Sequence, residues 1–99
     1  MEKNLKIQLL IGIIVVLFGL LLKISLIEWG IVVTIIFMVF FSEIVNTAIE
    51  NVVDMITIEY SEKAKIAKDI SAGGVTLVAI TSVIIGLIIF LPKILKIVL

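Results

Sequence analysis

Charged residues divide the chain into three long apolar stretches. No charge interrupts residues 7–22, residues 29–42 or residues 70–92. An α-helix rises about 1.5 Å per residue and a hydrocarbon core is about 30 Å thick, so about 20 apolar residues span a membrane. The pattern therefore predicts an all-α membrane protein with a single domain, residues 1–99, whose three spans cover residues 6–27, 29–55 and 69–92.

Polar residues mark the ends of the predicted spans. Lys23 can extend its side chain toward the headgroups, so residues 24–27 are expected to lengthen the first span. Trp29 suits the membrane interface at which the second span begins. Pro92 is expected to end the third span, because proline interrupts the hydrogen bonds of a helix. Between the second and third spans, residues 57–68 are expected to form a charged loop.

Lysine positions predict how the chain crosses the membrane. The N-terminal segment and the charged loop together carry five lysines, against three on the other side. Since lysine is enriched on the cytoplasmic side, the N-terminus and this loop are expected in the cytoplasm. No small-residue cleavage site follows the first stretch, which favours a retained span over a signal peptide.

Composition supports a membrane location and excludes several kinds of chemistry. Hydrophobic residues make up 63% of the chain and charged residues 16%, whereas soluble domains average roughly 45–50% and 25%. The net charge is zero and no residue is Arg, Cys or His. A nucleic-acid partner is therefore not expected, and zinc fingers, disulfides and Cys or His nucleophiles are excluded. Any chemistry must use carboxylates, lysines, amides and hydroxyls.

Four polar residues of the second span, Glu43, Asn46, Glu50 and Asp54, follow one another at spacings of 3, 4 and 4. These spacings place them on one helix face. An ionised carboxylate near the membrane centre costs about 2.5 kcal/mol or more, so the face needs a divalent cation, a cationic partner or bound protons. Asn46 can alternatively join helices, and Asp54 can simply lie at the interface. Oxygen ligands suit Mg²⁺, and Lys68 is positioned to neutralise an acid or bind phosphate.

Residues 43–54, with the pattern E-x-x-N-T-A-I-E-x-x-V-D, resemble the signature of the prokaryotic diacylglycerol kinase family, which includes undecaprenol kinases. Residues 59–60 (Glu-Tyr) and 67–69 (Ala-Lys-Asp) match further family motifs at the expected distance. The resemblance covers essentially the whole chain. It implies a small lipid kinase of the bacterial plasma membrane that uses ATP and Mg²⁺ and assembles as a homotrimeric bundle with shared active sites.

The resemblance also implies roles for individual residues. Glu43 is the expected general base, which takes the proton from the primary hydroxyl of a lipid. Asn46 is expected to steady Glu43 or the substrate hydroxyl, and Asp54 to support the metal and nucleotide end of the site. Glu50 and Glu2 are the expected ligands of the Mg²⁺ that bridges the ATP phosphates. The residues expected to bind ATP are Glu2, Glu50, Glu59, Tyr60, Ser61, Lys68 and Asp69, and those expected to contact the lipid are Glu43, Asn46 and Lys6.

Two features leave alternatives open. Family members usually carry an amphipathic surface helix before the position of Glu2, and this chain begins where that helix should end, which indicates either a truncated or misplaced start or a reduced homologue. Residues 23–29 and 65–69 look like the undecaprenol kinase branch, so undecaprenol is the expected substrate and diacylglycerol the alternative. A non-enzymatic holin-like or proteolipid-like protein is the remaining class, although neither needs this set of polar residues on one face.

Overall fold

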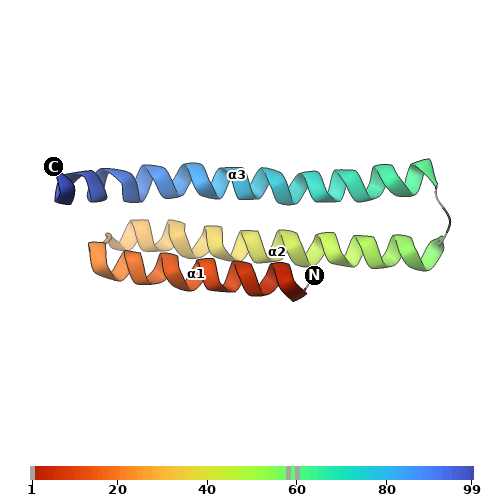
Figure 1. Ribbon diagram of the computed structural model, residues 1–99, viewed down its shortest axis with the longest axis horizontal. Coiled ribbons are helices and arrows are strands. Elements are labelled where there is room, and N and C mark those ends of the chain that lie inside the picture. Colours follow the sequence, from red (N-terminus) through yellow and green to blue (C-terminus); the bar gives the residue numbers. More distant parts are fainter. Residues whose placement is uncertain (1, 58, 60) are drawn as a thin grey trace.

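The computed structural model describes residues 2–57, 59 and 61–99, and side chains from residue 4 onward within these ranges. Three α-helices follow one another along the chain, α1 (Glu2–Leu22), α2 (Leu26–Ile56) and α3 (Glu62–Val98) (Figure 1). Each is long and apolar enough to cross a membrane. The predicted all-α membrane architecture with three candidate spans is therefore confirmed.

The helices pack side by side into a rod of 56 × 21 × 19 Å. α2 and α3 form a long antiparallel hairpin, and α1 lies along the first part of α2, so that the N-terminus lies beside the middle part of α2 (Figure 1). With 21 residues against 31, α1 is about 31 Å long and α2 about 46 Å. The hairpin therefore extends about 15 Å beyond the start of α1, on the side where α2 connects to α3.

The turn between α1 and α2 lies earlier in the chain than the sequence predicts, because α1 ends at Leu22 instead of continuing through residue 27 and α2 already begins at Leu26. Lys23 adopts the left-handed conformation, with φ 53°. The Ile24 N–H donates to the Gly19 carbonyl at 3.2 Å. This is the hydrogen bond that closes a Schellman motif, which satisfies a carbonyl of the last turn and reverses the chain direction.

A capping box begins α2 immediately after this turn. The Glu28 N–H donates to Ser25 Oγ at 3.2 Å, and the Ser25 N–H donates to Glu28 Oε1 at 2.8 Å. The same carboxylate oxygen forms an ion pair with Lys93 Nζ of α3 at 3.1 Å. Spacing of the S-x-x-E type is a sequence signature of helix starts, but the ion pair depends on how the hairpin is aligned.

α3 extends beyond the predicted third span at both ends. It begins at Glu62, inside the predicted 57–68 loop, because the Ser61 hydroxyl accepts a hydrogen bond from the Ala64 N–H at 3.4 Å and caps the helix. It continues through Pro92 to Val98, so the expectation that Pro92 ends the helix is wrong. A proline inside a helix removes one backbone N–H donor, while the backbone hydrogen bonds on either side of it remain in place.

Few side chains are buried within one chain. The buried apolar residues among those described are Ile24, Val32 and Ile89, and the half-buried side chains packed against them include Trp29 and Phe90. Most large apolar side chains are exposed, as expected where lipid or another membrane protein covers them. An apolar cavity of about 480 Å³ lies between the three helices, with Gln8 of α1 on its wall.

Candidate functional site

Two polar residues of α2 are buried in the bundle. Glu43 is 5% exposed and Asn46 is 9% exposed, and they are the buried polar or charged residues in the described part of the chain. They lie three positions apart, which places them on the same face of α2. Burial of a carboxylate and an amide in an apolar bundle is costly. Glu43 and Asn46 are therefore candidates for a functional role.

A chain of hydrogen bonds connects α3 to Glu50 through the amide of Asn46. The Ser71 hydroxyl donates to Asn46 Oδ1 at 2.7 Å, and Asn46 Nδ2 donates to Glu50 Oε1 at 2.9 Å. Sequence reasoning found Asn46 and Glu50 but missed Ser71. A single serine among apolar residues carries no signal of its own, and its contact depends on the alignment of two antiparallel helices.

An ion pair joins the end of α2 to the beginning of α3. Lys68 Nζ lies 2.6 Å from Asp54 Oδ1, and the two side chains are 40% and 60% exposed. The hypothesis that Lys68 neutralises an acid of the polar face is therefore confirmed in its geometry. Because both side chains are exposed to solvent, the energetic value of the pair is small, and its partners remain accessible to a charged ligand.

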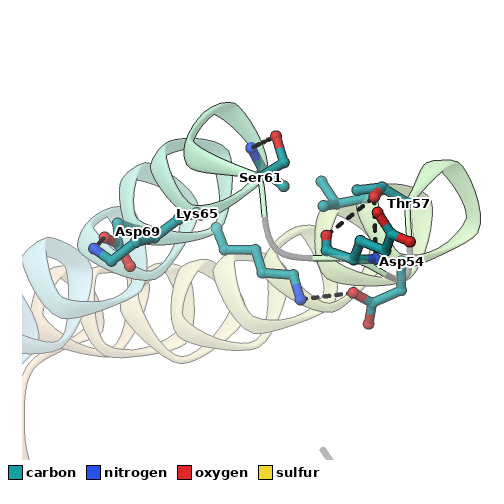
Figure 2. Close-up of a pocket in the computed structure, with 9 residues that line it drawn as sticks. Asp54, Thr57, Ser61, Lys65 and Asp69 are labelled. Atoms are coloured by element: carbon teal, nitrogen blue, oxygen red, sulfur yellow. Dashed lines mark hydrogen bonds and ion pairs between the residues drawn. The ribbon is translucent and has the colours of Figure 1, made fainter.

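A polar pocket of about 290 Å³ surrounds this ion pair (Figure 2). Asp54 and Thr57 reach it from the end of α2, and Ser61, Lys65 and Asp69 line it from the start of α3 (Figure 2). Five residues that the sequence assigns to the nucleotide end of the site meet in this pocket: Asp54, Glu59, Ser61, Lys68 and Asp69. Glu50 does not line it, and lies one helical turn before Asp54 on α2.

Two further pairs of residues are in contact within the pocket. Lys65 Nζ lies 2.7 Å from Asp69 Oδ2, four residues along α3. The Thr57 hydroxyl donates to the Glu59 carbonyl at 3.0 Å and accepts from the Glu59 N–H at 3.2 Å. The two hydrogen bonds between Thr57 and Glu59 hold the chain as it leaves α2.

Three predicted site residues remain to be placed: Lys6, Tyr60 and Glu2. Lys6 is exposed on α1. Tyr60 and the side chain of Glu2 lie outside the described residues. No group of three acidic side chains among the described residues is close enough to surround a metal ion. The half-buried Glu50 carboxylate still fits Mg²⁺, which usually binds through one or two carboxylates and completes its coordination with water and phosphate oxygens.

Comparison with known proteins extends these observations. The family model described as prokaryotic diacylglycerol kinase matches residues 1–90. The chain is 45% identical over 92 residues to an undecaprenol kinase of Bacillus subtilis (strain 168), covering 93% of this chain and 75% of that protein. It is 38% identical over 96 residues to a diacylglycerol kinase of Synechocystis sp., covering 96% of this chain and 55% of that protein. No solved structure matches the chain.

Proposed function

The chain belongs to the prokaryotic diacylglycerol kinase family of membrane lipid kinases, and on this basis we propose that it transfers the γ-phosphoryl group of ATP to the primary hydroxyl of undecaprenol. The 45% identity to an undecaprenol kinase over most of the chain supports this lipid. The 38% identity to a diacylglycerol kinase supports diacylglycerol as the second candidate. The resemblance predicted from the 43–54 motif is thus confirmed, and the non-enzymatic alternative is wrong.

Glu43 is the proposed general base, and its burial is the observation that carries the assignment. Its carboxylate accepts the hydroxyl proton of the lipid alcohol, while the hydroxyl oxygen forms a bond to the γ-phosphorus and the bond from that phosphorus to the ADP oxygen breaks. Asn46 lies on the same face and steadies Glu43 or the hydroxyl. Lys6, exposed on α1, is proposed to contact the lipid at its headgroup end.

The pocket between α2 and α3 is the proposed site of the ATP phosphates and nucleoside. The Lys68 ammonium, now 2.6 Å from Asp54, supplies charge for the phosphates. Glu50 and Glu2 would hold the Mg²⁺, which when bound withdraws charge from the phosphoryl oxygens. The other residues proposed to contact ATP are Glu59, Tyr60, Ser61 and Asp69.

We propose that the N-terminus and the connection between α2 and α3 lie in the cytoplasm of a bacterium, in a homotrimer within the plasma membrane. The end of the hairpin that projects beyond α1 carries the polar pocket, so this orientation places the pocket on the side where ATP is found. Most apolar side chains are exposed on a single chain, which supports assembly with further copies. The family resemblance supports three copies with shared sites.

Phosphoryl transfer from labelled ATP, with Mg²⁺ and the purified chain in mixed micelles, tests the proposal. Undecaprenol and diacylglycerol are offered in parallel, and transfer to undecaprenol is the expected result. Glu43→Gln removes the proton acceptor with little change in shape, so we expect the rate to fall by about 10²–10⁴ while helix content is unchanged. Glu62→Gln, which changes an exposed carboxylate in the first turn of α3, is the control and should retain activity.

Three results would contradict parts of the proposal separately. Full activity of Glu43→Gln would exclude it as the base, and preference for diacylglycerol would exclude undecaprenol as the main substrate. Absence of transfer to both lipids by the unmodified chain would contradict the kinase activity itself.

A further inference from the structure

We propose that Ser71 is a positioning residue for the metal-binding carboxylate of Glu50, acting through the amide of Asn46. The hydroxyl of Ser71, the Asn46 amide and the Glu50 carboxylate form one line of hydrogen bonds, from α3 to α2 and then along α2. This inference rests on the proposed function, because it concerns how the same site holds Mg·ATP.

The charges in this line determine how the Asn46 amide is oriented. Glu50 Oε1 is an acceptor, so the amide nitrogen must face it, at the observed 2.9 Å. The amide oxygen then faces Ser71, whose hydroxyl is able to donate, at 2.7 Å. With the amide rotated by 180°, two oxygens would meet at the Glu50 end and repel each other. The Glu50 carboxylate therefore selects this orientation of Asn46, and the Ser71 hydroxyl holds the amide in it from α3.

Because these residues are buried or half-buried, the loss of one hydrogen bond between them is costly. Asn46 is 9% exposed and Ser71 and Glu50 are both half-buried, so water compensates poorly for a lost partner. Removal of one partner from a buried polar group leaves the other unsatisfied, at a cost of about 1–3 kcal/mol. Without the Ser71 hydroxyl, the amide oxygen of Asn46 loses its partner on α3, and the amide that donates to Glu50 Oε1 is no longer held from both sides.

The line also links the position of α3 to the metal site. Lys68 stands three residues before Ser71 on α3 and contacts Asp54, four residues after Glu50 on α2. The same segment of α3 thus supplies the proposed phosphate contact and, through Ser71, restrains the proposed metal ligand. A displacement of this segment would therefore change the proposed phosphate contact and the restraint on Glu50 together.

Ser71→Ala tests the inference, because alanine is a better helix former than serine and the change leaves the helix intact. We expect the KM for Mg·ATP to rise about 5- to 30-fold, the factor that corresponds to about 1–2 kcal/mol, with kcat changed less than about 2-fold. Ser71→Thr keeps the hydroxyl and should restore most of the affinity. Thr81→Val is the control, since the exposed Thr81 hydroxyl bonds only the Leu77 carbonyl of its own helix.

An unchanged KM in Ser71→Ala would overturn the inference. So would a fall in kcat at constant KM, because Ser71 would then act on the chemical step and not on Mg·ATP binding. Failure of Ser71→Thr to restore affinity would likewise show that the hydroxyl is not the group that matters.

A second readout does not depend on activity. The chain contains three asparagines, so selective ¹⁵N labelling gives three side-chain amide signals, of which one belongs to Asn46. We expect Ser71→Ala to shift the Asn46 signals and leave the other two pairs unchanged, and unshifted signals would contradict the hydrogen bond. If the unmodified chain transferred phosphate to no lipid, the proposed function would fail, and this measurement would still decide whether Ser71 orients Asn46.

Discussion

The contact between Gly19 of α1 and Trp29 of α2 allows a quantitative test of how closely these helices pack. A Cβ atom at Gly19 would lie 2.7 Å from Cη2 and 3.0 Å from Cζ2 of the Trp29 indole, and 3.2 Å from Cδ1 of Ile24. The first distance is shorter than van der Waals contact allows. Gly19→Ala therefore forces the indole away from α1.

The expected effect is a net loss of stability. Overpacking a close contact costs about 1–3 kcal/mol, while replacement of glycine by alanine within a helix gains about 0.5–1 kcal/mol. We expect the free energy of unfolding to fall by about 1 kcal/mol, within a range of roughly 0–2.5 kcal/mol, after these terms are combined. Gly12→Ala is the matched control on the same helix, because its Cβ would meet only Ile36 Cγ2, at an ordinary 3.7 Å. It should be neutral or slightly stabilising.

Unfolding titrations in mixed micelles, followed by tryptophan fluorescence, measure both variants. Trp29 is the only tryptophan in the chain, so its emission reports directly on the residue that must move. We expect Gly19→Ala to shift the emission of the folded state and lower the unfolding midpoint. Equal stabilities for the two alanine variants, with the emission unchanged in both, would refute the close approach of α1 to α2.

Two ion pairs support further predictions. Lys93→Met removes the partner of Glu28 and should lower the unfolding midpoint at low salt, with the difference shrinking as salt screens the unmodified chain; a midpoint difference that does not respond to salt would contradict this. Lys68→Met removes the proposed phosphate contact and should raise the KM for ATP about 10-fold or more, whereas the exposed Lys63→Met should not. Equal KM values for these two variants would exclude Lys68 from ATP binding.

Much of the fold and part of the site could be predicted from the sequence, because both depend on periodicity within one helix. Uninterrupted apolar stretches gave the three spans, and spacings of three and four placed Glu43 and Asn46 on one face. The structure adds that this face is turned inward, since both residues are buried. The roles assigned to these residues depend on the family resemblance and remain predictions.

Contacts between helices were harder to predict, because they depend on how far one helix is displaced along another. Glu28 and Lys93 are far apart in the sequence, and nothing in either segment indicates that they meet. The contact of Ser71 with Asn46 has the same origin. The position of Pro92 inside α3 is a different case, since local propensity favours an end there, yet α3 continues to Val98.

Two contacts at different positions along the hairpin fix how far α3 is displaced along α2. Ser71 contacts Asn46 in the half of the hairpin nearer the polar pocket, and Lys93 contacts Glu28 at the opposite end. These contacts are separated by about 27 Å along α2 and about 33 Å along α3, a difference that the long lysine side chain can accommodate. Sliding of α3 along α2 would break both. We therefore expect a change in bilayer thickness to tilt the pair as one body, so that lipid chain length would set the angle at which the polar pocket meets the membrane surface.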